Sequence, residues 1–376
     1  MAVRILHCHS TFSLGGKEAR AVRLMNAMGD RAEHAILSAM PDRLGARAAI
    51  DRGVKADFPK DAPPLTGPPT PARLWRLARF MRGFDLVLSY NWGAFDAVMA
   101  KRIFGGPPLV HHEDGFNEDE AERLNPRRNR YRRLGLAGAH RLVVPSARLE
   151  KIALAAWGQP WERVVRIPNG VPVARFLQPP EEGAIPGVER RDGELLIGTV
   201  AGLRAVKNLP RLVRAFSRMR HKAARLVIVG EGPESERIAA EARAHGVAAR
   251  LVLPGFLADP ARWIGHFDIF ALSSDSEQFP ISLVEAMAAG LPAVATAVGD
   301  VGAIVAEDNA PLIVAPRDEA AFAAALDSLA EQPQLRRAIG EANREKAAAL
   351  YDEAAMIAAY TALYEEAIGR PGALTV

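Results

Sequence analysis

The chain has 376 residues, more than one hydrophobic core usually sustains, so we expect two domains. Its 49% hydrophobic and 24% charged residues are typical of a globular protein. The single cysteine, Cys8, excludes a disulfide framework within the chain, and a formal net charge of +4 without a basic aromatic stripe or zinc-ligand spacing excludes a dedicated nucleic-acid binder.

Membrane insertion is not expected from the sequence. No apolar run approaches the roughly 20 residues that span a bilayer, and residues 1–5 lead directly into a strand-like segment, not into a signal peptide. We therefore expect a cytoplasmic protein, whose small basic excess suits anionic ligands or the inner face of a membrane.

The first half of the chain alternates strand-like runs with helical patterns. A run at 3–7 leads into a glycine-containing turn at 10–16 and then into an amphipathic helix. Further strand-like runs follow at 34–38, 85–89, 108–111 and 141–145. This alternation predicts a parallel sheet covered by helices, because parallel strands need helical crossovers. Six prolines among the thirteen residues at 59–71 predict a surface loop.

Gly15 and Gly16 close the turn before the first helix. Two glycines allow a ligand to approach the backbone and present N–H groups at a helix N-terminus, while a plain strand-to-helix turn is the alternative. His7 and His9 share one face of the preceding strand, but no cluster of Cys or His elsewhere supports a metal site, so we expect none.

His111 ends the run at 108–111 and precedes an acid-rich stretch from Glu113 through residues 117–120. Ligands of parallel α/β sheets bind at the carboxyl ends of strands, so His111 is placed for a site, with a surface or satisfied histidine as the alternative. The acids lack Asp-x-Asp spacing and predict a solvated loop. Five arginines between Arg127 and Arg133 suit anionic lipid headgroups or an acceptor pyrophosphate, and a solvated helix face is the alternative.

The alternation restarts after a Pro-, Gly- and charge-rich segment at 178–193, which predicts a linker. Strand-like runs then lie at 194–200, 225–229, 251–256, 267–272 and 291–296. Arg204 and Lys207 follow the first of these runs and are placed to neutralise a leaving diphosphate, with exposed surface charges as the alternative. Gly230 and Glu231 belong to a glycine turn that matches a dinucleotide fingerprint only weakly.

Two glutamates bracket one predicted helix start in the stretch 273–292. The first N–H groups of that helix, at Ile281, Ser282 and Leu283, lack intrahelical partners, and the helix dipole attracts phosphate there. Glu277, before the helix, is placed to accept hydrogen bonds from sugar hydroxyls, and Glu285, inside it, from a ribose diol. The alternative is that Glu277 only favours the dipole and Glu285 is a chance acid on a buried helix.

Taken together, these motifs resemble the retaining glycosyltransferases of family 4, whose GT-B fold has two Rossmann-like domains with parallel sheets facing a central cleft. The motifs occur in the family's order along nearly the whole chain: Gly15–Gly16, Ile167–Val171, Arg204 with Lys207, Val229–Pro233, Pro254–Phe256 and Glu277–Glu285. Residues 110–115 and 273–292 look most like bacterial enzymes of exopolysaccharide and lipopolysaccharide assembly.

The resemblance implies a role for each motif. Arg204 and Lys207 would bind the donor diphosphate and stabilise the charge that grows on it. Glu277 would contact the transferred sugar, and Glu285 the ribose. The implied donor-binding set also contains Gly15, Gly16, Gly230, Glu231, Phe256, Phe279, Pro280, Ile281, Ser282 and Leu283, with the backbone around Phe256 at the base.

His111 matches the family's active-site histidine on the acceptor side. The implied reaction keeps the anomeric configuration through an oxocarbenium-like state and uses neither a metal nor another cofactor. Gln278 stands where many members have glycine, so a side chain occupies a position where backbone usually meets the donor sugar.

The resemblance implies an acceptor-side domain at 1–177, the linker at 178–193, a nucleotide-sugar domain at 194–350 and a final helix at 351–376 that returns to the first domain. We expect transfer of a hexose from a UDP- or GDP-linked sugar to a glycan or lipid-linked saccharide in cell-surface polysaccharide synthesis. The alternatives are a GT-B nucleotide-sugar epimerase and a non-catalytic nucleotide-sugar-binding protein. Peripheral contact with an anionic membrane through Arg127–Arg133 is a further expectation.

Overall fold

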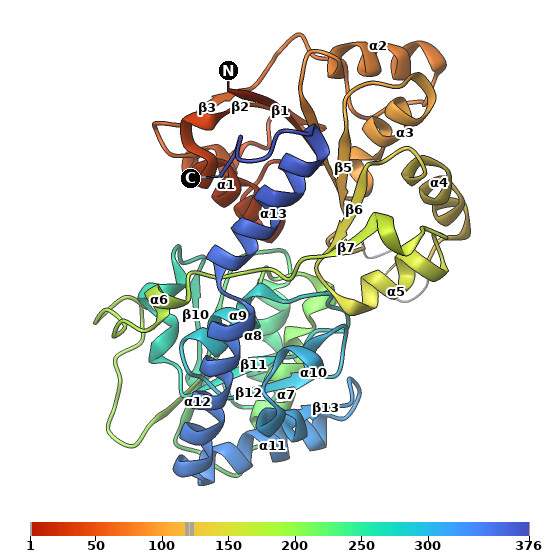
Figure 1. Cartoon of the computed structure of the whole chain (residues 1–376). Helices are drawn as coiled ribbons and strands as arrows, with labels where there is room; N and C mark the ends of the chain where they lie inside the picture. Colours follow the sequence, from red (N-terminus) through yellow and green to blue (C-terminus); the bar gives the residue numbers. More distant parts are fainter. Residues whose placement is uncertain (1, 117–119, 121–123, 376) are drawn as a thin grey trace. The chain divides into compact units, whose positions relative to one another are not determined.

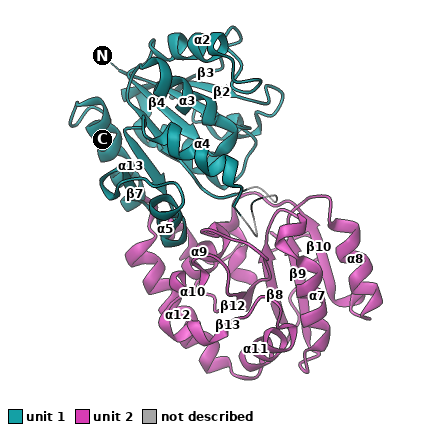
Figure 2. Cartoon of the chain, turned by 90° about the vertical axis from the view of Figure 1, so that its right-hand side faces the viewer, with its two compact units in different colours: residues 1–169, 354–376 teal, residues 170–353 magenta. Residues whose placement is uncertain are grey.

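The computed structural model describes residues 2–116, 120 and 124–375. The chain divides into two compact units, unit 1 with residues 1–169 and 354–376 and unit 2 with residues 170–353 (Figures 1 and 2). Each unit is built on one parallel sheet, which confirms the predicted pair of Rossmann-like domains.

Unit 1 has a seven-stranded sheet with the order β3-β2-β1-β4-β5-β6-β7, parallel throughout. Its strands are β1 (Val3–His9), β2 (Ala32–Ser38), β3 (Lys55–Asp57), β4 (Leu86–Tyr90), β5 (Leu109–His112), β6 (Arg141–Val144) and β7 (Val164–Arg166). Its helices are α1 (Gly16–Met28), α2 (Pro71–Met81), α3 (Phe95–Phe104), α4 (Pro126–Leu136), α5 (Ala147–Ala155) and α13 (Glu353–Ile368). The short edge strands β3 and β7 are absent from the sequence prediction, because three residues are too few to show a period.

Helices cover both faces of this sheet. One face packs against α1 and α13. Tyr360 and Tyr364 of α13 lie in the same hydrophobic cluster as Ile5 and Leu88 of the sheet. The other face packs against α2, α3 and α5. The last helix of the chain is therefore part of the core of unit 1.

Unit 2 has a six-stranded parallel sheet with the order β10-β9-β8-β11-β12-β13. Its strands are β8 (Leu195–Val200), β9 (Ala224–Val229), β10 (Leu251–Gly255), β11 (Ile269–Leu272), β12 (Ala293–Thr296) and β13 (Ile313–Val314). Its helices are α6 (Val173–Phe176), α7 (Leu209–Arg218), α8 (Ser235–Ala244), α9 (Ile281–Ala288), α10 (Val301–Ile304), α11 (Glu319–Glu331) and α12 (Pro333–Leu350).

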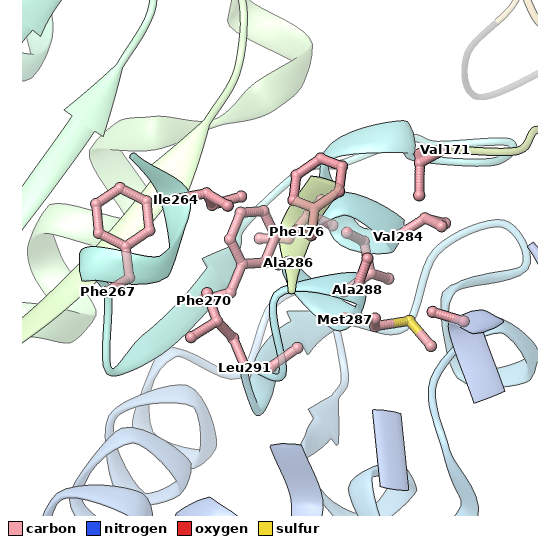
Figure 3. Packing of buried hydrophobic residues seen from close by; sticks show 14 of the residues in the cluster. Val171, Phe176, Ile264, Phe267, Phe270, Val284, Ala286, Met287, Ala288 and Leu291 are labelled. Carbon is pink, nitrogen blue, oxygen red and sulfur yellow. The ribbon is translucent and has the colours of Figure 1, made fainter. Parts of the chain in front are cut away.

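Helix α9 is fixed by an apolar cluster on one face of this sheet. Val284 and Met287 of α9 pack in one cluster with Phe270 of β11 and with Phe176 of α6 (Figure 3). Six of the eight residues of α9 are buried, so its start cannot shift without disturbing the core.

The unit boundaries differ from those expected. Residues 170–193 belong to unit 2, not to the first domain and a linker, and the last helix begins at Glu353. Ile185, which is 2% exposed, packs in the core of unit 2, and Arg225 donates hydrogen bonds to the carbonyl oxygens of Gly187 and Glu189. The segment at 178–193 is therefore anchored to unit 2 despite its linker-like composition.

Four histidines lie buried at the sheet of unit 1: His7, His9, His34 and His112. The ring of His9 stacks on Tyr90 with 4.0 Å between centroids, and Tyr90 stacks on His112 with 4.6 Å. His7 Nε2 lies 3.0 Å from His34 Nδ1, and His112 Nε2 lies 2.8 Å from the hydroxyl oxygen of Tyr364 in α13.

Burial lowers the pKa of each of these rings. The pKa values of His7, His9 and His112 lie well below 6.5, where neighbouring positive charge adds to the effect of burial, and that of His34 falls to about 4. The rings are thus neutral in the folded state. In the unfolded chain they take up protons below about pH 6.5.

Unit 1 should lose stability as the pH falls from 6.5 toward 4. Below the unfolded pKa of a histidine whose pKa is lowered by folding, the unfolded chain binds a proton that the folded protein does not bind. Each ring therefore lowers the free energy of unfolding by about 1.4 kcal/mol per pH unit of acidification. Urea unfolding between pH 7.5 and 5 measures the slope. His9→Phe should reduce that slope, because phenylalanine takes up no proton in the unfolded chain. The substitution breaks no hydrogen bond of the described residues, since both nitrogens of His9 lack a partner among them. An unchanged slope in this variant would contradict the assignment.

Candidate active site

The loop after β8 carries the two predicted cations. It contains Arg204 and a short 3₁₀ helix, η6 (Ala205–Lys207), and Asn208 in a left-handed conformation turns the chain into α7. The side chain of Lys207 is 19% exposed and points to a partner, whereas Arg204 is exposed and forms no ion pair with the described residues. The two cations therefore differ in their surroundings.

Lys207 meets Glu277 from the loop after β11. Lys207 Nζ lies 2.6 Å from Glu277 Oε1, and the hydroxyl of Ser274 donates to the same oxygen at 2.7 Å. The three side chains line a small cavity at the carboxyl ends of β8 and β11, together with Thr199, Val200, Ala201, Leu209, Leu272, Ser273 and Ser282. Lys207, Glu277 and Ser282 are thus brought together, as the sequence predicts.

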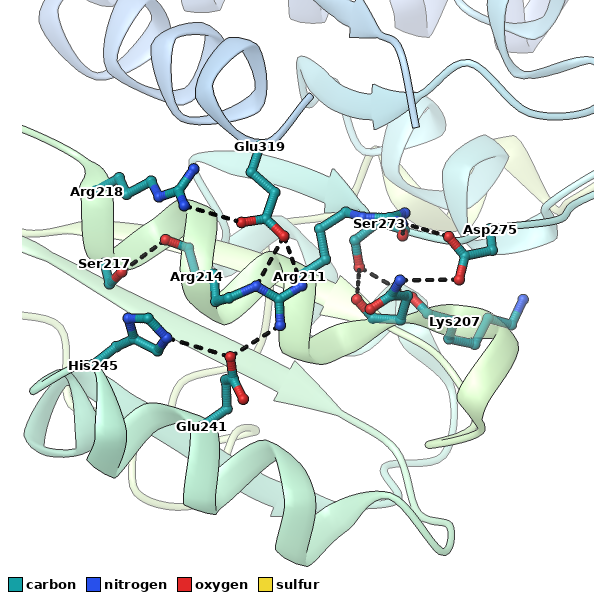
Figure 4. A network of polar contacts seen from close by, with 11 residues as sticks. Lys207, Arg211, Arg214, Ser217, Arg218, Glu241, His245, Ser273, Asp275 and Glu319 are labelled. Carbon is teal, nitrogen blue, oxygen red and sulfur yellow. Dashed lines mark hydrogen bonds and ion pairs between the residues drawn. The ribbon is translucent and has the colours of Figure 1, made fainter. Parts of the chain in front are cut away.

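Hydrogen bonds hold the two loops together behind this cavity. The hydroxyl of Ser273 lies 3.1 Å from the carbonyl oxygens of both Lys207 and Asn208 (Figure 4). Arg211 donates to the carbonyl oxygen of Ser273 at 3.0 Å and pairs with Asp275 at 2.6 Å. The position of the Glu277 loop therefore depends on Arg211 as well as on Lys207.

A second polar group fixes α7 itself. Arg214 donates to Glu319 of α11 at 2.6 Å and to Glu241 of α8 at 2.9 Å (Figure 4). Hydrogen bonds from Arg214 hold the pKa of Glu319 below its ordinary value, against the opposing effect of burial. The helix that follows the Lys207 loop is thereby tied to both neighbouring helices.

Glycines permit two close backbone approaches beside the cavity. A Cβ on Gly230 would lie 1.9 Å from the carbonyl oxygen of Ala201, and one on Gly299 would lie 2.1 Å from that of Glu277. Both residues have positive φ, 143° for Gly230 and 56° for Gly299. Gly299, in the loop after β12, was missed at the sequence level, although its position after a predicted strand is a usable signal.

Helix α9 begins beside Glu277. Pro280 precedes it and supplies no side-chain cap, and among the described residues the N–H groups of Ile281 and Ser282 have no hydrogen-bond partner. The N–H of Leu283 bonds to the carbonyl of Pro280 at 3.1 Å, so it is less available than predicted. Glu285 lies inside the helix and is 8% exposed.

Two predicted donor residues, Phe279 and Phe256, do not line the cavity, and neither does Gln278, which replaces the glycine of many family members. Phe279 packs edge-on against Tyr351 at 5.5 Å. Gln278 is 8% exposed, and its Oε1 has no partner among the described residues. Phe256 is 56% exposed, and its backbone N–H donates to the carboxylate of Glu231 at 3.4 Å.

The predicted residues of unit 1 lie at the ends of β1 and β5. Gly15 is exposed and precedes α1, which begins at Gly16. His111 is 0% exposed, with its Nδ1 2.9 Å from the hydroxyl oxygen of Ser89 and its ring packed against Phe95. The side chain of His111 is therefore covered in this structure.

The acid-rich stretch is not a solvated loop where the structure describes it. Glu113 is 0% exposed at its side chain, with Oε2 lying 3.8 Å from His111 Nε2 and 3.5 Å from Arg132 Nε. Glu120 is also buried and accepts two hydrogen bonds of 3.0 Å from Arg132. The prediction was wrong for these two acids because arginines of α4 neutralise them, and residues 117–119 lie outside the described residues.

The five arginines between Arg127 and Arg133 differ from one another in burial. Arg132 is 1% exposed and lies between Trp92 and Trp157, and Arg128 pairs with Glu120 at 3.0 Å. Only part of the run, Arg127, Arg130 and Arg133, is exposed. The five arginines therefore do not form one continuous exposed face.

Within residues 2–116, 120 and 124–375, every helix is too short or too polar to span a lipid bilayer. The same residues contain no group of three or more His, Cys, Asp or Glu side chains that could hold a metal ion.

Known proteins match both units. Residues 5–175 match the family model Glycosyltransferase Family 4, and residues 183–346 match Glycosyl transferases group 1. A putative glycosyltransferase, EpsF, of Bacillus subtilis is 30% identical over 208 residues, which cover 52% of this chain and 53% of that protein. A D-inositol 3-phosphate glycosyltransferase of Pseudarthrobacter chlorophenolicus is 28% identical over 286 residues, covering 69% of this chain and 65% of that protein.

Solved structures agree on the fold. Anabaena Alr3699/HepE in complex with UDP superposes with a TM-score of 0.79 at 19% identity and covers 96% of this chain and 98% of its own. Two Rossmann-like units of this kind define a GT-B glycosyltransferase fold. The chain belongs, by the matches of its two halves, to the family 4 type of these glycosyltransferases, and its matched stretches span about half to two thirds of the length of the curated relatives named above.

Lys207→Met should lower the free energy of unfolding of unit 2 by about 2 kcal/mol, because it leaves the largely buried carboxylate of Glu277 with Ser274 as its one remaining described partner. Arg204→Met is the matched control, since Arg204 is exposed and forms no ion pair in the described part of the chain. Urea unfolding at pH 7.5 measures both variants. Equal stability losses in the two variants would contradict the asymmetry described above.

Proposed function

We propose that the protein is a retaining glycosyltransferase that moves a hexose from a UDP- or GDP-linked sugar to a glycan or lipid-linked saccharide. The observation that carries the proposal is the cavity of unit 2, where Lys207, Glu277 and the start of α9 meet. A cation, a carboxylate and helix N–H groups within one cavity suit a ligand that combines phosphate with sugar hydroxyls.

In the proposed donor complex, Lys207 and Arg204 neutralise the diphosphate, and the N–H groups of Ile281 and Ser282 face a phosphate oxygen. Glu277 accepts hydrogen bonds from the transferred sugar, and Glu285 accepts them from the ribose. The backbone near Phe256 lies at the base. In support, the structurally similar Alr3699/HepE has been solved with UDP and with UDP-glucose.

In the proposed reaction, the bond between the anomeric carbon and the β-phosphate oxygen breaks while a bond from that carbon to the acceptor oxygen forms. The acceptor proton passes to the leaving phosphate, whose negative charge Lys207 and Arg204 stabilise as it grows. We propose that this requires no metal. His111 keeps its proposed place on the acceptor side, and it reaches an acceptor once the side chains that cover it move.

Two other functions use the same cavity. A nucleotide-sugar epimerase is disfavoured because the family models and the named relatives are glycosyltransferases. A non-catalytic binding protein would bind the donor without releasing its sugar. Release of sugar from the donor, lost in Lys207→Ala, separates this possibility from the enzyme.

The proposed setting is the cytoplasmic side of cell-surface polysaccharide assembly. It rests on the resemblance of residues 110–115 and 273–292 to enzymes of exopolysaccharide and lipopolysaccharide synthesis. One relative is named for D-inositol 3-phosphate, which is an anionic polyol, and its name supports an anionic acceptor.

Calorimetric titration with UDP, GDP, ADP and NAD, without added metal, should show selective binding of one nucleoside diphosphate. Glu285→Ala should weaken that binding more than Glu277→Ala does, because ribose belongs to the nucleotide and the transferred sugar does not. Equal nucleotide affinities of the two variants would contradict the assigned roles. Binding of NAD alone, or of none of the four, would contradict the proposed function.

We propose that the exposed arginines of α4 also make contact with anionic membranes. The protein should cosediment with phosphatidylglycerol vesicles at low salt and dissociate as salt rises, since screening weakens exposed charges. Arg130→Gln combined with Arg133→Gln should reduce cosedimentation. Binding that does not depend on lipid charge would leave these arginines as a solvated surface.

A further inference from the structure

A second, larger cavity lies wholly within unit 1. Its volume is about 490 Å³, within the range of small-molecule sites. Its walls come from the residues just after β4, from the first two turns of α4 and from the proline-rich loop at 66–69. None of the residues assigned above to donor binding lines it.

The wall after β4 is a rigid aromatic surface. Trp92 stacks on Phe95 with 5.5 Å between ring centroids and meets the edge of Tyr131 at 5.7 Å. The guanidinium groups of Arg128 and Arg132 lie 5.3 and 5.0 Å from the centroid of the Trp92 ring. Because protein neighbours already hold Trp92, its ring need not be ordered by a ligand.

The opposite wall is also preformed. Arg73 of α2 donates to the carbonyl oxygens of Leu65, Gly67 and Pro68, at 3.1, 2.9 and 2.9 Å. The same guanidinium pairs with Asp96, which lines the cavity. One buried arginine thus fixes the loop and neutralises the carboxylate in the cavity.

The charge that ion pairs within the protein leave unneutralised in the cavity is positive. Asp96 is paired with Arg73, and Arg128 is paired with Glu120. Arg127, in the first turn of α4, lines the cavity, is exposed and forms no ion pair within the described residues. A ligand that fits this arrangement carries an anionic group for Arg127 and a flat C–H face for Trp92.

We propose that this cavity binds the acceptor, and that the acceptor is a saccharide bearing an anionic group, either a phosphate or a carboxylate. One face of the sugar ring packs on the aromatic wall that Trp92 forms with Phe95 and Tyr131, and the anion bonds to Arg127. The link to an acceptor rests on the proposed glycosyltransferase function, whereas the binding itself does not. A cavity walled on opposite sides suits a discrete sugar better than the plane of a lipid surface.

Ligand-observed NMR titration of the full chain tests the proposal, with glucose, glucose 6-phosphate, glucuronate and inorganic phosphate as probes. At least one anionic sugar should bind more tightly than glucose, and the preference between the two names the anion. Arg127→Gln should weaken binding of that sugar about tenfold and leave glucose unchanged, since a charge-assisted hydrogen bond is lost. Trp92→Ala should weaken every sugar.

Matched controls sit outside the cavity. Arg130→Gln, on the same helix, and Trp161→Ala, whose side chain is 75% exposed, should bind all probes as the unchanged protein does. If Trp92→Ala fails to fold, Arg127→Gln at an exposed position still decides the outcome. Equal affinities of glucose and both anionic sugars, or inorganic phosphate binding as tightly as the preferred anionic sugar, would overturn the proposal.

The two proposals fail separately. Nucleotide titrations on Arg127→Gln and Trp92→Ala should match those of the unchanged protein, because neither residue belongs to the set assigned to donor binding. Nucleotide binding without any sugar preference in unit 1 would overturn only the acceptor site. Sugar binding in unit 1 with no nucleotide binding would overturn the proposed function and keep the site.

Discussion

The ion pair between Lys207 and Glu277 joins two loops that are 70 residues apart in the chain. It forms because β8 and β11 are parallel neighbours, so that both loops leave the sheet at the same edge. β12 is the next strand along, and its following loop brings Gly299 against the backbone of Glu277. Residues that follow β8 and β11 thus build one small cavity, and the loop after β12 supports the backbone of Glu277.

In unit 1, neighbouring parallel strands also end at one edge of the sheet, but side chains there pack into a buried stack. Its neighbouring strands β1, β4 and β5 place His9, Tyr90 and His112 in one stack, which α13 then covers. In unit 2 the carboxyl ends of β8 and β11 border a small cavity, whereas in unit 1 stacked aromatic and imidazole rings pack beside the ends of β1, β4 and β5. The larger cavity of unit 1 lies between the segment after β4, the start of α4 and the loop at 66–69.

The fold could be predicted because its signal is local. Most strands are apolar runs of four or more residues, and the alternation with helices repeats along the chain. The paired glutamates were likewise visible, since one short stretch contains both. Contacts between distant segments carry no such signal, and the environments of Glu113, Glu120 and Arg132 show this. Each looks like a surface charge in the sequence, yet the pairing of the two acids with Arg132 permits all three to be buried.

The cavity of unit 1 was invisible for a related reason. Its residues form no recognisable motif in the sequence. The role of Arg73 is visible only from the carbonyl groups that it binds in the loop at 64–68. The arginines of α4 looked alike in the sequence. Burial then separated them into two that hold the structure together and others that remain available to a ligand.

The place of α13 in the chain affects the order in which the units are completed. Unit 2 is one continuous segment, residues 170–353, so all of its contacts are available before the last helix is synthesised. The core of unit 1 includes Tyr360 and Tyr364, which follow all of unit 2 in the chain and therefore emerge from the ribosome after it. Although its strands come first in the sequence, unit 1 is therefore the last to close its core, and until then one face of its sheet is exposed to chaperones and to misfolding.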